Sequence, residues 1–90
     1  MKITRSAVAG TLESSDVFVT VAPSEDGLSI HIESVVYDQF SELIRAAVSE
    51  TLTSFHVNNA VVSLNDRGAL DCTIRARVET AIRRAGKGEG

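Results

Sequence analysis

The chain has ninety residues, enough for one domain; 43% of them are hydrophobic, 23% are charged, and the net charge is −3. These values exclude a disordered chain and disfavour a nucleic-acid binder, which needs a clustered basic surface. We expect no membrane segment and no signal peptide, because no apolar run approaches the required length. The single cysteine, Cys72, cannot form an internal disulfide, which favours a reducing compartment and predicts a cytoplasmic protein.

The first third of the chain predicts three strands. Residues 7–12 are small and apolar, and residues 17–22 and 28–32 alternate with period two, which is typical of half-buried strands. The segments between them, residues 13–16 and 23–27, contain polar turn formers.

A helix is predicted over about residues 35–55. Apolar residues recur there every three or four positions for five turns, with polar residues between them. Ser34 is a suitable N-cap, Asp38 favours the first turns through the helix dipole, and His56 marks the end.

The last third is ambiguous. Residues 60–64 alternate as a strand, and the turn formers of residues 65–68 follow them. We predict a hairpin that returns up to about residue 76, and then a short helix over about 77–85. The alternative is one helix over the whole segment, in which Asp71, Arg75, Glu79 and Arg83 would form a ladder of alternating charge.

The predicted fold is therefore α+β: a single two-layer domain in which the two helices cover a mostly antiparallel sheet of about five strands. We expect the domain over residues 1–85 and a flexible Gly-rich tail over residues 86–90.

Few residues suggest catalysis. His31 is expected on the outer face of its strand, either solvated or facing a partner, and His56 just beyond a helix end. Cys72 alternates with apolar residues, so we expect a buried structural thiol. The spacing of these residues does not suggest a metal site. The arginines between residues 75 and 84 are expected to form a solvated charged face, with docking to an acidic partner as the alternative.

Residues 13–16 (ESSD) have two interpretations. They form either a simple polar turn or an exposed site at which another enzyme modifies a serine hydroxyl. A serine with no adjacent histidine is not a catalytic nucleophile, but it can be an attachment point.

Several segments resemble one known family over nearly the whole chain. Residues 7–17 (AVAGTLESSDV) are similar to the N-terminal signature of the citrate lyase acyl carrier protein, the gamma subunit. Gln39 and Phe40 match in the long helix, and residues 65–72 (NDRGALDC) and 74–79 (IRARVE) match a second block in the same order.

The resemblance implies that Ser14 carries 2′-(5″-triphosphoribosyl)-3′-dephospho-coenzyme A through a phosphodiester, with Ser15 as a second hydroxyl beside it. It implies that the thiol of this arm holds acetyl and citryl groups, that an alpha subunit exchanges acetyl for citrate, and that a beta subunit cleaves the citryl group to oxaloacetate. It also implies a prosthetic-group transferase as a partner, and no catalytic or metal-binding residue in this chain.

Two alternatives stay open. The related carrier of malonate decarboxylase uses the same kind of arm. A protein-interaction domain without any modification would contain residues 13–16 only as a turn.

Overall fold

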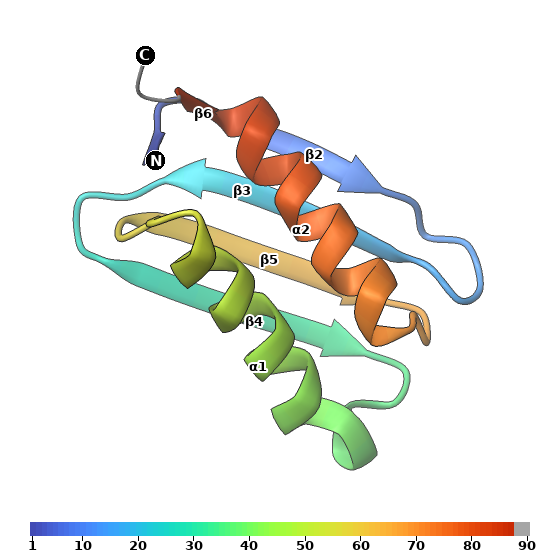
Figure 1. The fold of residues 1–90 in the computed structure, drawn as a ribbon. Coiled ribbons are helices and arrows are strands. Elements are labelled where there is room, and N and C mark those ends of the chain that lie inside the picture. The colour runs from blue at the N-terminus through green and yellow to red at the C-terminus, as the bar shows by residue number, and fades with distance from the viewer. Residues whose placement is uncertain (88–90) are drawn as a thin grey trace.

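The computed structural model describes residues 1–87 and consists of two helices packed on one face of a four-stranded sheet (Figure 1). The predicted α+β class and the two-layer arrangement are confirmed. The strands are β1 Lys2–Ile3, β2 Ala7–Gly10, β3 Val17–Pro23, β4 Leu28–Ser34, β5 Ala60–Asp66 and β6 Gly86–Lys87. The helices are α1 Tyr37–Ser54 and α2 Asp71–Ala85.

The strand order in the main sheet is β2-β3-β5-β4. Strand β5 pairs antiparallel with β3 and parallel with β4, so it lies between two strands that follow each other in the sequence. Because parallel neighbours need a crossover connection, helix α1 carries the chain from the end of β4 back to the start of β5.

The core lies between the sheet and the helices. Alternate residues of β3 and β5 point toward the helices and are buried, as the period-two pattern predicts. Helix α1 contributes Val48 and Leu52, and α2 contributes Val78 and Ile82, all fully buried. Neither helix within residues 1–87 covers the opposite face of the sheet (Figure 1).

Ser34 is not the N-cap of α1, contrary to the prediction. The N-cap is Val36, and its side chain makes no capping hydrogen bond. Ser34 remains in β4, where its hydroxyl donates to Asp66 Oδ2 at 2.8 Å and accepts from the Val36 N–H at 3.1 Å. Ser34 therefore hydrogen-bonds to Asp66 at the end of β5 instead of capping the helix, although the local sequence favours a cap at this position.

The predicted hairpin over residues 69–76 is wrong, because α2 begins at Asp71. Both edges of β5 are already paired, with β3 and β4, so the following segment has no free strand edge beside it. It packs instead as a helix over β2 and β3. The charge ladder of the alternative interpretation forms in part, with Arg75 bound to Asp71 and Arg83 bound to Glu79.

The two chain ends lie side by side (Figure 1), because β1 pairs antiparallel with β6. Gly86 and Lys87, assigned above to the tail, form β6. Residues 88–90 of that expected tail lie outside the described residues. Neither helix within residues 1–87 is long and apolar enough to cross a membrane.

Candidate functional site

The loop that contains Ser14 joins β2 to β3 at the end of the molecule opposite the chain ends (Figure 1). Ser14 and Ser15 are both exposed. The backbone of Ser15 is held in the left-handed region, at φ 65°, and its N–H donates to the Arg67 carbonyl at 2.8 Å. Arg67 in turn donates to the Asp16 carbonyl at 2.9 Å. The loop is thus attached to the β5–α2 connection on one side and leaves the Ser14 side chain in solvent.

Asp16 holds the base of this loop. Its carboxylate accepts from the Thr11 hydroxyl at 2.7 Å and from the Val17 N–H at 2.8 Å. The Arg77 guanidinium on α2 donates to both carboxylate oxygens, at 3.1 and 3.0 Å. A two-pronged arginine–carboxylate pair fixes orientation as well as distance, so α2 sets the position of the loop.

These contacts change the acidity of Asp16. The hydrogen bond from Thr11, followed by that from the Val17 N–H, lowers the pKa of Asp16 from 3.8 to about 2. Arg77 lowers the pKa further, while partial burial of the carboxyl opposes the change. The Asp16 side chain is only 14% exposed, so at neutral pH the loop is fastened by a charged and largely covered carboxylate.

Gly10 permits the tight exit from β2 into this loop. Its φ is +88°, and an added Cβ would lie 1.8 Å from the Val17 carbonyl oxygen. Only glycine fits there without a shift of the backbone.

The two histidines do not join the site. His31 lies on the open face of the sheet and is exposed, as predicted. His56 follows α1 at the opposite end of the molecule, where its carbonyl accepts from the Met1 ammonium at 3.0 Å. Within residues 1–87 no hydrogen bond connects either histidine ring to Ser14, so neither histidine can act as a base that activates the serine.

Cys72 is exposed, so the predicted buried thiol is wrong. In a strand, its alternation with Leu70 and Ile74 would place all three on one face. In α2, by contrast, Ile74 points into the core and Cys72 points outward. Among the described residues no group of three or more His, Cys, Asp or Glu side chains could hold a metal ion.

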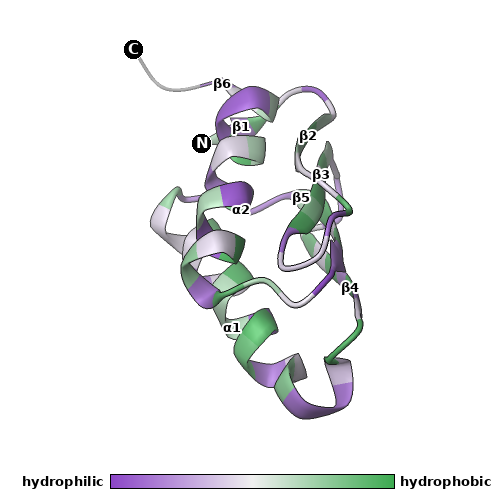
Figure 2. Cartoon of the chain, turned by 90° about the vertical axis from the view of Figure 1, so that its right-hand side faces the viewer, coloured by the Kyte–Doolittle hydropathy of each residue, from purple (hydrophilic) through white to green (hydrophobic). Residues whose placement is uncertain are grey.

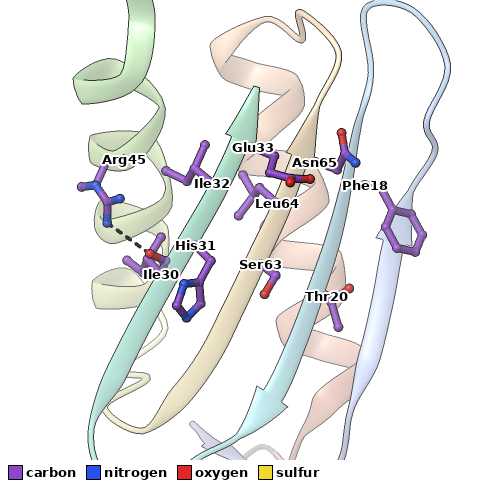
Figure 3. Close-up of a pocket in the computed structure, with 10 residues that line it drawn as sticks. All are labelled: Phe18, Thr20, Ile30, His31, Ile32, Glu33, Arg45, Ser63, Leu64 and Asn65. Atoms are coloured by element: carbon purple, nitrogen blue, oxygen red, sulfur yellow. Dashed lines mark hydrogen bonds between the residues drawn. The ribbon is translucent and has the colours of Figure 1, made fainter. Parts of the chain in front are cut away.

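A shallow hollow of about 520 Å³ lies on the open face of the sheet (Figure 3). His31 and Ser63 are neighbours in the register of β4 and β5, as are Glu33 and Asn65. The hydrogen bond drawn in this view joins Arg45 to the Ile30 carbonyl at 3.4 Å and involves none of these four side chains. The hollow therefore lacks the linked nucleophile, base and orienting group that a catalytic site requires.

The contact between Asp16 and Arg77, which are 61 positions apart, was not predicted from the sequence. Asp16 was expected only in a turn, and Arg77 among the solvated arginines. One signal was available. A helical α2 places Arg77 on a different side from Arg75 and Arg83, each of which has a carboxylate partner four positions earlier in the same helix.

Comparison with known proteins gives a consistent result. The model of a family described as "ACP: Malonate decarboxylase delta subunit (MdcD)" matches residues 4–85. The citrate lyase acyl carrier protein of Streptococcus uberis is 51% identical over 94% of this chain and 84% of its own length. That of Albidiferax ferrireducens is 54% identical over 94% of this chain and 88% of its own length.

The fold has a relative among solved structures as well. A chain in the crystal structure of a Pseudomonas malonate decarboxylase hetero-tetramer in complex with malonate superimposes with a TM-score of 0.77. It is 22% identical, and the match covers 96% of this chain and 93% of that chain. Because the sequence matches span almost the whole domain at about half identity, this chain belongs to the citrate lyase acyl carrier protein family.

Proposed function

We propose that this chain is the acyl carrier subunit of citrate lyase, with Ser14 as the residue to which the prosthetic arm is attached. The observation that carries the proposal is the 51–54% identity to citrate lyase acyl carrier proteins over 94% of the chain. The exposure of Ser14 at the free end of a fastened loop supports it, because a modifying enzyme must reach the hydroxyl.

The proposed arm is 2′-(5″-triphosphoribosyl)-3′-dephospho-coenzyme A, joined to the Ser14 oxygen by a phosphodiester. When bound, it supplies a thiol on a long tether, which raises the local concentration of an acyl group at successive active sites. The residues of this chain act as the base of the tether. Asp16, Arg77 and Arg67 hold the loop, and the activating base comes from the prosthetic-group transferase.

The backbone conformation of the loop favours Ser14 over Ser15 as the attachment residue. The N–H of Ser15 is bonded to Arg67 and its φ is left-handed, so Ser15 is part of the fastened side of the loop. Ser14 precedes this restrained position. Its side chain can accept a bulky group without disturbing the bonds to Arg67.

The proposed partners are an alpha subunit that transfers acyl groups, a beta subunit that cleaves the citryl group, and the transferase that loads the arm, all in the cytoplasm. This chain then has no reaction of its own. Purified alone it should not cleave citrate, and activity should appear when the alpha and beta subunits are added to the loaded chain.

Intact mass tests the attachment. Protein produced together with the enzymes that make and transfer the arm should gain the mass of the prosthetic group. The gain should disappear in Ser14→Ala and persist in the matched control Ser15→Ala. Loss of the adduct in Ser15→Ala alone would assign the site to Ser15, and an unmodified wild type in cells with active citrate lyase would favour the interaction domain without modification.

A second candidate is the carrier subunit of malonate decarboxylase. It is favoured by the description of the matching family model and by the fold of the Pseudomonas structure. The loaded chain should restore citrate cleavage with citrate lyase alpha and beta subunits. If the loaded chain instead restores the decarboxylation of malonate by malonate decarboxylase subunits and does not restore citrate cleavage, the second candidate is correct.

A further inference from the structure

Large apolar side chains are exposed mainly at the end of the molecule that carries Ser14. Within the described part of the chain, eight are exposed, and Val8 and Leu28 are the two that lie elsewhere. The other six are Leu12, Val35, Tyr37, Phe40, Leu43 and Leu70. Leu43 and Leu70 are 65% and 70% exposed, so neither contributes much to the core. Such a concentration on a small domain is typical of an interaction surface.

Part of this surface is hollowed. A cavity of about 450 Å³ lies between the first half of α1 and the start of α2, and we call it the Leu70 groove. Its lining residues are Val36, Phe40, Leu43, Ile44, Asp66, Gly68, Ala69, Leu70, Asp71 and Ile74. Figure 2 looks at the molecule from this end and shows hydrophobic segments in the first turns of α1. Tyr37 and Phe40 are two of the four aromatic residues in the chain, and aromatic side chains dominate the energetics of protein interfaces.

The Leu70 groove is continuous with the loop of Ser14. Arg67 exchanges backbone hydrogen bonds with Ser15 and Asp16, and the next three residues of the chain, 68–70, line the groove. A partner that covers the groove would therefore lie directly beside Ser14.

The charges around the groove have one predominant sign. Residues 11–16, 33–43 and 66–71 contain one basic residue, Arg67. The acidic residues in these segments are Glu13, Asp16, Glu33, Asp38, Glu42, Asp66 and Asp71. Asp66 is buried, and Asp16 and Asp71 are paired with Arg77 and Arg75 of α2. In these segments the exposed carboxylates without an ion pair within residues 1–87 are therefore Glu13, Glu33, Asp38 and Glu42. Basic residues gather at the opposite end, around the paired β1 and β6, where Arg5 donates to the Arg84 carbonyl. A matching partner surface would be basic around an apolar centre.

We propose that the Leu70 groove docks a catalytic subunit of the lyase complex, which inserts an apolar projection ringed by Lys and Arg side chains. The inference rests on the proposed carrier function, since a carrier must turn its loaded serine toward each active site. Docking beside Ser14 fixes the base of the arm while its far end stays mobile.

Binding of the purified alpha and beta subunits to the full chain tests the proposal. Leu70→Ser should weaken the affinity for at least one subunit by roughly tenfold or more, as expected when an anchor side chain is removed. The fold should survive, because Leu70 is the N-cap of α2 without a capping hydrogen bond, and serine is a preferred N-cap residue. Leu43→Ser provides a second variant, and circular dichroism and Tm check the fold of each.

Leu28→Ser is the matched control, since Leu28 is 44% exposed and lies at the other end of the sheet. It should bind like the wild type. A charge reversal, Glu42→Lys, should slow association and weaken its dependence on salt.

The outcomes separate the inference from the function on which it rests. If the wild type binds a subunit and Leu70→Ser and Leu43→Ser bind equally well, the groove is not the docking site, and the carrier function stands. If the wild type alone forms a dimer that Leu70→Ser dissociates, the groove joins two copies of this chain and the proposal is overturned. If the wild type binds neither subunit, the carrier function fails, and the inference fails with it.

Discussion

Replacing Asp16 by asparagine should loosen the base of the Ser14 loop. The amide has nearly the same shape as the carboxylate but no charge, and only one of its two terminal atoms accepts hydrogen bonds. The four bonds that Asp16 receives from Thr11, Val17 and Arg77 cannot all be kept. An amide oxygen at the Oδ1 position keeps the bonds from the Val17 N–H and Arg77 Nε, but the amide nitrogen at the other position cannot accept from Arg77 Nη2, so the two-pronged pair is broken.

The pKa of Asp16 sets a ceiling on the size of the effect. A pKa lowered from 3.8 to about 2 corresponds to roughly 2 kcal/mol of stabilisation, because each pKa unit is worth about 1.4 kcal/mol. Arg77 is 41% exposed, so solvent screening reduces this value. We expect Asp16→Asn to lower the free energy of unfolding by about 1–2 kcal/mol at pH 7, and the Tm by about 4–8 °C per kcal/mol.

The pH dependence identifies the cause. Because the folded-state pKa of Asp16 is the lower one, its stabilisation is fully present above pH 3.8 and is lost as the pH falls through about 2. Urea unfolding of both proteins, followed by circular dichroism from pH 7 down to the acid limit of folding, should show their difference shrinking below about pH 4.

The matched control is Glu13→Gln, which removes an exposed carboxylate from the same loop. It should change the unfolding free energy by less than about 0.5 kcal/mol at pH 7. A difference between wild type and Asp16→Asn that stays constant from pH 7 to pH 2.5 would refute the electrostatic reasoning.

Two further predictions concern Gly10 and Cys72. Gly10→Ala should destabilise the domain by at least about 2 kcal/mol in urea unfolding, because left-handed strain adds to the contact with the Val17 carbonyl oxygen. Gly27→Ala is the control: Gly27 has the same left-handed strain, at φ +89°, but an added Cβ would meet no atom within 4 Å. This variant should lower the free energy of unfolding by only about 1–2 kcal/mol. An equal decrease in the two variants would show that the backbone relaxes to relieve the contact at Gly10. Cys72 should react with a thiol reagent in the folded protein at a rate comparable to that in the urea-unfolded chain, and strong protection on folding would contradict its exposed position.

Local patterns in the sequence predicted much of the architecture. The alternation of residues 17–22, 28–32 and 60–64 and the helical spacing of residues 35–55 each describe one element that buries one face. Such a pattern is contained in neighbouring residues, so it can be recognised without knowing the rest of the fold. The exposed turn around Ser14 was predicted for the same reason.

Residues 70–78 show where local pattern is insufficient. Their apolar positions fit both a strand and a helix, and the choice depended on whether β5 had a free edge. Since β3 and β4 occupy both edges, the segment became helical, which exposed Cys72 and carried Arg77 to Asp16.

The sequence by itself therefore determined the class of the domain, most of its strands, its long helix and the exposed serine, because each follows from the periodicity or turn chemistry of adjacent residues. Only the tertiary structure decided the start of α2, the partner of Ser34, the bonds that fasten the Ser14 loop and the apolar groove beside it. These features bring together residues that are distant in the chain: Asp16 is bonded to Arg77, and Phe40 and Leu70 line the same groove. Their proximity depends on how strands and helices pack, which no local pattern encodes.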